Sequence, residues 1–597
     1  MATIKYPEVW DLDVFFAGGS ESPAFQAFMD QLPHKVEATK KQITALTIDV
    51  NEQQLKEALA HIADTLMHIS HAGGMLSCLT AQNIKDTKAL LLSSQLSSIS
   101  ASYSPVILRL QQLLAEIDEQ RFHALIQSEL LNEFAFILME WREQAKQKLS
   151  EEEETLIAEL GVDGYSSWGQ LYNMFIGDIK VEVDVEGETK YLSVGQANNL
   201  SSHPNEAVRK SAFDALEKVF TEKEEFFAKT LNHLAGFRLT TYKKRGWDEV
   251  LQEPLQINRM KKETLEAMWG AISDHKAPFV KFLKTKASML GKEKMDWYNF
   301  DAPVTSSTAK VSYQEGAEFI LKHFGKFGAQ LAAFARQAFE DGWIEAEDRD
   351  NKRPGGFCTG FPLAEQSRIF MTYSGTMSNV STLAHELGHA FHTYALRPVN
   401  PLNRRYAMNV AETASTFAEM IVADAAVEEA TTTEEKIALL EDKLQRSIAF
   451  FMNIHARFLF ETRFYEERKQ GIVATKRLNE LMEEAQREAF AGALDEAHPH
   501  FWASKMHFYI TGVPFYNFPY TFGYLFSLSV YAKAKEEGAA FEEKYIALLR
   551  DTAVMTVEDL AMKHLNEDIT KREFWEKGIV LCVRDVEEFI QLVSKEG

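Results

Sequence analysis

The sequence predicts a mainly α-helical protein with more than one domain-sized unit. Apolar residues recur every three or four positions over residues 24–72 and 86–147, beside long Glu/Lys/Gln-rich faces with few prolines. The same pattern returns from about 205 to 345. A chain of 597 residues is also too long for one ordinary core. We therefore expect an N-terminal helical region over 1–200 and a second region over 201–597.

Two short segments break the helical pattern and predict small β elements. Strict alternation of apolar and polar residues flanks a Gly-containing turn, which indicates a hairpin near 179–194. Gly and Pro are frequent over residues 351–375, where 368–373 is typical of a short strand. The segment that follows is amphipathic and is expected to be helical.

Composition and charge exclude several classes of protein. Hydrophobic residues make up 46% of the chain and charged residues 25%, so a folded globular protein is expected. The net charge of −23 argues against nucleic acid or an anionic membrane as a partner. No apolar run approaches the roughly 18 residues of a membrane span. The three cysteines, Cys78, Cys358 and Cys582, form no disulfide pattern, and no signal peptide is evident, so we expect a cytoplasmic location.

The run His385-Glu386-Leu387-Gly388-His389 predicts a zinc site on a helix. Histidines four residues apart lie on one helix face, so both can reach one Zn²⁺ at about 2.0–2.1 Å. Glu386 follows the first histidine and is placed to act as general base toward a water molecule. Apolar residues surround these three polar side chains, and buried polar groups without partners are costly. This is the chemistry of a zinc peptidase.

A catalytic zinc site needs a third protein ligand. His392 lies three residues after His389 but does not complete the longer histidine motif, so we assign it either to a supporting position behind the ligands or to packing. The segment 408–420 is helical and otherwise apolar or small, and it carries Glu412 and Glu419 on one face. Acidic groups on an apolar face require a cation. Glu412 is our expected ligand, and Glu419 either orients a histidine or is the alternative ligand.

An aromatic segment near the C-terminal end, residues 507–527, combines Tyr, Phe, Gly and Pro residues and begins with a histidine. One interpretation is an aromatic plug in the core. Buried tyrosine hydroxyls need partners, however, and hydroxyl and imidazole donors suit the oxyanion that forms during amide hydrolysis. The interpretation as oxyanion donors is preferred because a zinc site is already predicted.

Three segments in this order resemble the oligoendopeptidase F branch of the thimet-oligopeptidase family, including the Pz-peptidases. They are Gly375-Thr376 with the run 382–392, then Ala411-Glu-Thr-Ala-Ser415, then the run 515–526. Weaker similarity extends over most of the chain. The resemblance implies a largely helical ellipsoid with a deep substrate channel, in which the strand at 368–373 is an edge strand and residues 201–597 form the catalytic region.

The resemblance also implies roles for individual residues. His385, His389 and Glu412 match the ligands of one Zn²⁺ per chain, and Glu386 matches the general base. His507 and Tyr524, together with either Tyr516 or Tyr520, match the donors to the substrate carbonyl and its oxyanion.

The expected activity is hydrolysis of internal bonds in short unstructured peptides. Release of carboxy-terminal dipeptides at the same site is the alternative, because loops beyond the scissile bond decide between the two. A non-catalytic helical peptide-binding protein would lack a ligand or the base, and none is missing. Short peptides are the expected partners, without nucleic acid or membrane. A monomer and a small homo-oligomer remain equally open.

Overall fold

Helices form almost all of the regular structure, as the sequence predicts. The computed structural model describes residues 6–305 and 310–596. The N-terminal helices are α1 (Asp13–Phe16), α2 (Pro23–Thr44), α3 (Glu52–Gln82), α4 (Thr87–Glu116), α5 (Glu119–Gln127) and α6 (Ala135–Lys146). The helices of the middle part are α7 (Glu151–Gly161), α8 (Ser167–Asp178), α9 (Val194–Asn199), α10 (Glu206–Arg245), α11 (Gln252–Ile257), α12 (Lys262–Asp274), α13 (Lys276–Met289), α14 (Tyr313–Phe327) and α15 (Ala329–Glu340).

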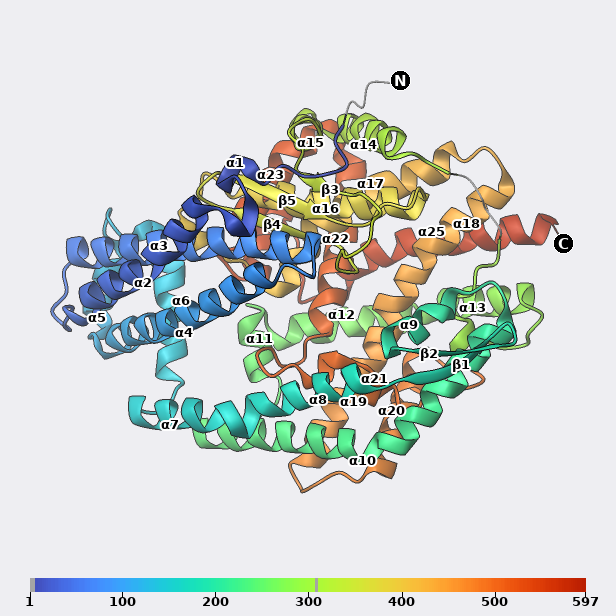
Figure 1. Cartoon of the computed structure of the whole chain (residues 1–597), viewed down its shortest axis with the longest axis horizontal. Helices are drawn as coiled ribbons and strands as arrows, with labels where there is room; N and C mark the ends of the chain where they lie inside the picture. The colour runs from blue at the N-terminus through green and yellow to red at the C-terminus, as the bar shows by residue number, and fades with distance from the viewer. Residues whose placement is uncertain (1–5, 306–309, 597) are drawn as a thin grey trace.

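The C-terminal third is also helical and contains the predicted zinc motif. Its helices are α16 (Met377–Ala395), α17 (Met408–Glu429), α18 (Thr433–Ile448), α19 (Ile454–Arg468), α20 (Thr475–Ala489), α21 (Phe501–Ser504), α22 (Phe518–Glu537), α23 (Phe541–Asp551), α24 (Val557–Leu565) and α25 (Arg572–Glu596). Figure 1 shows the N-terminal helices grouped on one side of the molecule, with α10 along the lower edge and α16 and α17 in the upper half. In the described part of the chain, no helix has both the length and the apolar character needed to cross a membrane.

The predicted hairpin is confirmed. Strands β1 (Val181–Val185) and β2 (Glu188–Leu192) pair antiparallel, with Val181 opposite Leu192. Glu186 and Gly187 connect them with φ values of 56° and 87°, the left-handed conformation that a two-residue hairpin turn requires. Val181 and Val183 are buried while Glu182 and Asp184 are exposed, which explains the alternation in the sequence.

A second sheet corrects one expectation. It contains β3 (Ile344–Glu345), β4 (Phe357–Phe361) and β5 (Gln366–Phe370) in the order β3-β5-β4. The strand expected near 368–373 exists as β5, but it lies in the centre of the sheet and not at its edge. It pairs parallel with β3 and antiparallel with β4. Because β5 pairs on both sides, β3 and β4 are the edge strands, and β4 is the one that lines the cavity beside the zinc motif.

Buried apolar side chains form two cores. One unites the N-terminal helices and takes Phe361 and Phe370 from the second sheet. The other extends through the rest of the described chain and contains the helices of the predicted zinc site. Tyr172, Val181 and Val194 belong to this second core although they precede residue 200. The division of the chain at residue 200 therefore stays a prediction.

Candidate active site

The zinc motif lies on α16, which begins at a well-defined cap. The Thr376 hydroxyl accepts a hydrogen bond from the Asn379 backbone N–H at 3.2 Å, and the Asn379 side chain accepts one from the Thr376 N–H at 3.3 Å. This reciprocal pair satisfies two N–H groups that a helix start leaves free. His385 and His389 then lie on successive turns, with ring centroids 4.9 Å apart.

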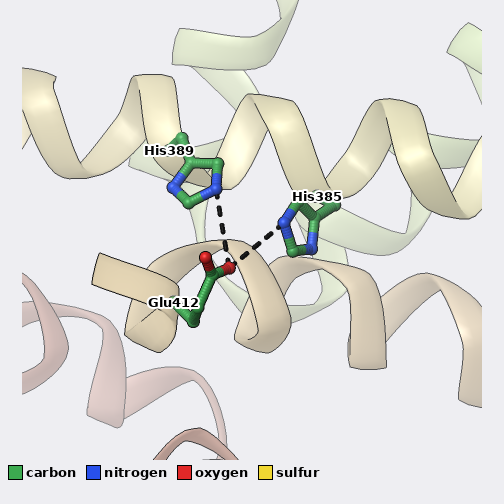
Figure 2. A group of neighbouring side chains, drawn as sticks. All are labelled: His385, His389 and Glu412. Carbon is green, nitrogen blue, oxygen red and sulfur yellow. Dashed lines mark ion pairs between the residues drawn. The ribbon is translucent and has the colours of Figure 1, made fainter. Parts of the chain in front are cut away.

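Glu412 on α17 faces both histidines, as Figure 2 shows. Its Oε2 atom lies 3.2 Å from Nε2 of His385 and 3.6 Å from Nε2 of His389. Ser415 donates a hydrogen bond of 2.8 Å to the same oxygen. One ligand atom from each of the three residues lies within 4.8 Å of the others, so this group could hold a metal ion. The structure thus brings together the three residues that the sequence singled out as ligands.

Two glycines set the close helix contacts that position Glu412. A Cβ atom on Gly388 of α16 would lie 2.5 Å from Cα of Ser415 on α17. A Cβ atom on Gly523 of α22 would lie 2.8 Å from Cβ of Glu412. Real Cβ atoms do not approach so closely, so only glycine permits these two crossings. Because α16 and α22 both approach α17 near residue 412, the carboxylate is held directly beneath the two histidines.

Protonation states in this group suit metal binding. Burial raises the pKa of the Glu412 carboxyl, but hydrogen bonds and charges from His385, His389 and Ser415 outweigh burial and lower this pKa to about 2. Burial, with the charge of His385 adding, lowers the pKa of His389 to about 4. A carboxylate and a neutral imidazole are the forms in which these side chains act as ligands.

Glu419 supports the site from the next turns of α17. Its Oε2 atom lies 2.9 Å from Nδ1 of His385, the ring nitrogen that faces away from Glu412. Its other oxygen forms an ion pair with Arg446 of α18. A carboxylate on the far nitrogen fixes the orientation and tautomer of a metal-binding histidine. Of the two roles considered for Glu419, the structure favours that of orienting His385.

Glu386 points into a cavity of about 440 Å³ between α16, α17 and β4. Its side chain is 7% exposed, and its Oε2 atom has no hydrogen-bond partner among the described residues. Burial raises the pKa of Glu386 to about 7. Gly356 gives this carboxylate its room, since a Cβ atom there would lie 3.3 Å from Oε1. The role of Gly356 was not foreseen, although the Gly-rich run before β4 marked the segment as unusual.

The other histidine of the motif helix is a packing residue, as expected. His392 is fully buried, and its Nε2 atom lies 2.9 Å from the Thr552 hydroxyl. Its ring stacks on Tyr406 at 4.1 Å. His392 is not part of the group of three described residues that could hold a metal ion.

Three members of the aromatic segment cluster beside the site. The ring of His507 lies 5.6 Å from Tyr516 and 6.5 Å from Tyr520, and the two tyrosine rings are 5.8 Å apart. Burial raises the pKa of Tyr520, and a hydrogen bond with Tyr516 and the charge of Glu412 add to the shift. The Nδ1 atom of His507 is buried and lacks a hydrogen-bond partner within the described residues. Of the three residues, Tyr520 is the one whose pKa the charge of Glu412 affects.

Tyr524 does not join this cluster. Its side chain is 4% exposed, and its ring stacks on Phe450 at 4.4 Å. Its hydroxyl lies 3.0 Å from the Ser447 hydroxyl and 3.8 Å from Sγ of Cys582. These contacts place Tyr524 in the core, so the geometry gives no support to its expected role as a donor. For this one residue, the aromatic-plug interpretation fits better.

Comparisons with known proteins find related peptidases over most of the chain. A model described as Peptidase family M3 matches residues 326–579, and one described as Oligopeptidase F matches residues 114–180. Oligopeptidase PepF of Bacillus subtilis is 23% identical over 618 residues, covering 99% of this chain and 88% of that protein. An oligoendopeptidase F homolog of Lactococcus lactis is 25% identical, covering 75% of this chain and 74% of that protein.

Solved structures show the same fold. Oligoendopeptidase-F from Enterococcus faecium superposes with a TM-score of 0.71 at 18% identity, covering 96% of this chain and 99% of that chain. PZ peptidase A gives a TM-score of 0.73 at 16% identity, covering 94% of this chain and 97% of that chain. Both alignments span nearly the whole molecule, so the arrangement of helices described above is shared from end to end.

Proposed function

The chain belongs to peptidase family M3, in its oligoendopeptidase F branch, and is a metallo-oligopeptidase; we propose that it hydrolyses internal bonds of short unstructured peptides, with Glu386 as general base. The observation that carries this proposal is the position of Glu386. Its buried carboxylate lies between the two histidines in sequence and opens on the same cavity as Glu412. Ligands and base therefore face one reaction space.

The three donors fit Zn²⁺, and we propose one ion per chain. Two imidazole nitrogens and one carboxylate oxygen are a common ligand set for catalytic zinc, which keeps one position open for water or substrate. When bound there, zinc supplies a Lewis acid for the scissile carbonyl and favours deprotonation of a water molecule. His385, His389 and Glu412 would hold it, with Glu419 keeping His385 in the required tautomer.

Glu386 would move the proton during hydrolysis. Its Oε2 atom accepts a proton from the attacking water and then delivers it to the nitrogen of the leaving amine. This atom is available because no described residue occupies it with a hydrogen bond. The surrounding burial keeps bulk water from competing for the same proton.

His507 and Tyr520 are our proposed donors to the oxyanion, with Tyr516 assisting Tyr520. The charge of Glu412 contributes to the raised pKa of Tyr520. The rings of His507, Tyr516 and Tyr520 form one cluster. Fixed donors stabilise negative charge that develops in the transition state without any reorganisation. The proposal thus replaces Tyr524 by Tyr520 in the donor pair, because the Tyr524 hydroxyl bonds to Ser447.

The substrate would lie extended along β4. This strand is the edge of its sheet, and residues 356–360 line the cavity with Glu386. An edge strand offers backbone groups that can pair with an extended peptide. A folded protein keeps its backbone in its own hydrogen bonds, so we propose unstructured peptides of roughly 5–20 residues as substrates. The three cysteines are free, which is consistent with our proposal of a cytoplasmic location.

A length series tests this proposal. One unstructured sequence is prepared from 4 to about 40 residues and assayed beside a folded protein and its unfolded form. We expect the highest kcat/KM for short peptides, no cleavage of the folded protein, and loss of all cleavage with a zinc chelator. Cleavage of a long unfolded chain as readily as a decapeptide would contradict the restriction to short peptides. Chelator-resistant cleavage would contradict the metal site itself.

A further inference from the structure

Two cationic side chains beside the aromatic cluster lack an acidic partner. The Cζ atom of Arg457 on α19 lies 5.1 Å from the ring centroid of Phe501, and Nζ of Lys505 lies 4.9 Å from the same centroid. Neither side chain forms an ion pair with any acid in the described parts of the chain. Both positive charges therefore lie against the ring of Phe501 without a direct ion pair.

Other buried cations in the described chain have acceptors at their charged atoms: Arg238 and Arg368, which form no ion pair with an acid, donate hydrogen bonds from all three guanidinium nitrogens. Lys443 lies 2.7 Å from both Asp424 and Asp585, and Lys286 lies 2.7 Å from Glu441. Removing a charge from water without such a partner is costly. Arg457 and Lys505 differ from these cations because each keeps a charged donor without an acceptor among the described residues, which leaves that donor available to a ligand.

Arg457 is anchored and still has one free edge. Its Nε atom donates to Asn453 at 2.9 Å and its Nη1 atom to Asn517 at 3.1 Å. Amide oxygens orient the guanidinium but do not cancel its charge, and Nη2 has no partner among the described residues. Asn517 immediately precedes α22, so the contact also fixes Arg457 relative to Tyr520.

Lys505 is free at its charged end. Its Nζ atom makes no hydrogen bond with any residue that the structure describes, and it lines a cavity of about 220 Å³ together with Trp297 and Phe501. Burial, with the charge of Arg457 adding, lowers the pKa of Lys505 to about 8. Asp301 lines the same cavity and its charge opposes the lowering of the Lys505 pKa, but it forms no ion pair with Lys505, and its carboxylate accepts a hydrogen bond from Ser201 at 3.0 Å.

Both cations are close to the proposed catalytic donors. Lys505 precedes His507 by two residues, and the charges of Arg457 and Lys505 both lower the pKa of His507, after burial as the larger cause. Burial lowers the pKa of Arg457, and the charge of Tyr520 opposes this shift. Because both cations contact Phe501 and Lys505 precedes His507 by two residues, a carboxylate bound to either cation would lie near the aromatic cluster.

We propose that Arg457 and Lys505 form a subsite that binds a carboxylate of the peptide substrate. The inference rests on the proposed peptidase function and adds a preference to it. A guanidinium edge and an ammonium group make charge-assisted hydrogen bonds to carboxylate oxygens, and such bonds are the stronger ones in proteins. A peptide offers this group in two places, at its C-terminus and on Asp or Glu side chains. Binding of the C-terminus near the scissile bond would favour release of short carboxy-terminal fragments.

Matched peptides distinguish the two sources. The first pair is one cleavable peptide with a free C-terminal carboxylate or a C-terminal amide. The second pair carries the amide in both members and has Glu or Gln at each position on the C-terminal side of the scissile bond in turn. We expect the wild-type enzyme to prefer the carboxylate in at least one pair by roughly 10–100-fold in kcat/KM. Hydrolysis of no peptide would contradict the proposed function itself, which separates the two failures.

Lys505→Met and Arg457→Gln then test the residues. Each variant removes one charge and keeps much of the side-chain length, and we expect the carboxylate preference to fall at least fivefold in each. Lys476→Met is the matched control, because Lys476 is 90% exposed, and it should keep the wild-type preference. Binding of the same peptides to Glu386→Gln enzyme, measured by calorimetry, provides a readout independent of turnover. Equal kcat/KM within both peptide pairs, or a preference that survives in both variants, would overturn the proposal.

Discussion

Gly388 of α16 lies against the backbone of Ser415 on α17, so closely that a Cβ atom at position 388 would be 2.5 Å from Cα of Ser415. The glycine stands between Glu386 and His389 in the sequence, at the level where Glu412 reaches both histidines. The distance between the two helices therefore sets the distance between the ligands. A helix-destabilising residue is retained in the motif helix because this crossing tolerates no side chain.

Gly388→Ala should separate the two helices and weaken metal binding. Overpacking of this kind costs about 1–3 kcal/mol in the free energy of unfolding. We expect a lower denaturation midpoint and less than one zinc per chain after dialysis. Gly195→Ala in α9 is the control, because nothing lies within 4 Å of a Cβ atom there, and it should bind zinc like the wild type. A Gly388→Ala variant with wild-type zinc content and stability would refute this account of the crossing.

Variants of Glu386 and Glu412 should distinguish the role of general base from that of metal ligand. Glu386→Gln keeps the shape of the side chain but cannot accept the proton, so we expect close to one zinc per chain and loss of most turnover. Glu412→Ala reduces three ligands to two, so both zinc and activity should be lost. Metal analysis beside a quenched fluorescent peptide assay checks both variants. Full zinc content in Glu412→Ala together with zinc loss in Glu419→Ala would identify Glu419 as the ligand instead.

The sequence alone predicted the parts of the site that local pattern determines. His385 and His389 share a face through helical periodicity, and Glu412 and Glu419 share one on the next helix, so residue spacing was sufficient. Strand order in the second sheet depends on tertiary contacts, and no local pattern showed that β5 would be central and β4 the edge. The sequence also did not show that Arg457 would lack an ion pair with an acid of the described chain, since this depends on which acids the fold brings near.

The choice between Tyr520 and Tyr524 shows the same limit. The two residues are four positions apart on α22 and so point to similar sides of the helix. Periodicity cannot separate them. The packing of Phe450 and Ser447 on Tyr524 decides which hydroxyl remains available, and these residues belong to a segment some 70 positions earlier in the chain.

Tyr520→Phe and Tyr524→Phe should therefore have different effects. Loss of one donor to the oxyanion typically lowers kcat by about 100–1,000-fold, and we expect this for Tyr520→Phe with zinc content unchanged. Tyr524→Phe removes a buried hydrogen bond to Ser447, so it should lower stability by about 1 kcal/mol and leave kcat nearly unchanged. Steady-state kinetics and thermal unfolding of both variants provide the measurement. The reverse pattern would return the donor role to Tyr524.

A buried acid–histidine cluster predicts how stability depends on pH. Glu217 of α10 lies 2.5 Å from Nδ1 of His498 and 2.9 Å from Nδ1 of His500, in the segment that leads to Lys505 and His507. Burial raises the pKa of Glu217, but both histidines outweigh it and lower this pKa from its ordinary value of 4.5 to about 2. Burial lowers the pKa of His500, but Glu217 and then Glu224 outweigh it, so the net shift is above its ordinary value of 6.5.

The sign of each shift defines the pH window in which this cluster stabilises the fold. The lowered pKa of Glu217 contributes stability above about pH 4.5, and this is lost as the pH falls toward 2. The raised pKa of His500 contributes stability below about pH 6.5, and this is lost as the pH rises through the folded-state pKa. Both contributions are complete only between these two values. Glu217→Gln should therefore destabilise the protein most at pH 5.5, on the order of 1–3 kcal/mol, and less at pH 8.5.

Denaturant unfolding of wild type and Glu217→Gln at these two pH values measures the difference directly. Glu222→Gln on the same helix is the control, since Glu222 is exposed, and it should change stability by no more than about 0.5 kcal/mol at either pH. A destabilisation by Glu217→Gln that is equal at pH 5.5 and 8.5, or larger at pH 8.5, would show that His500 does not carry a proton against Glu217. Because the cluster ties α10 to the segment before His507, the ratio of variant to wild-type kcat should be lower at pH 5.5 than at pH 8.5.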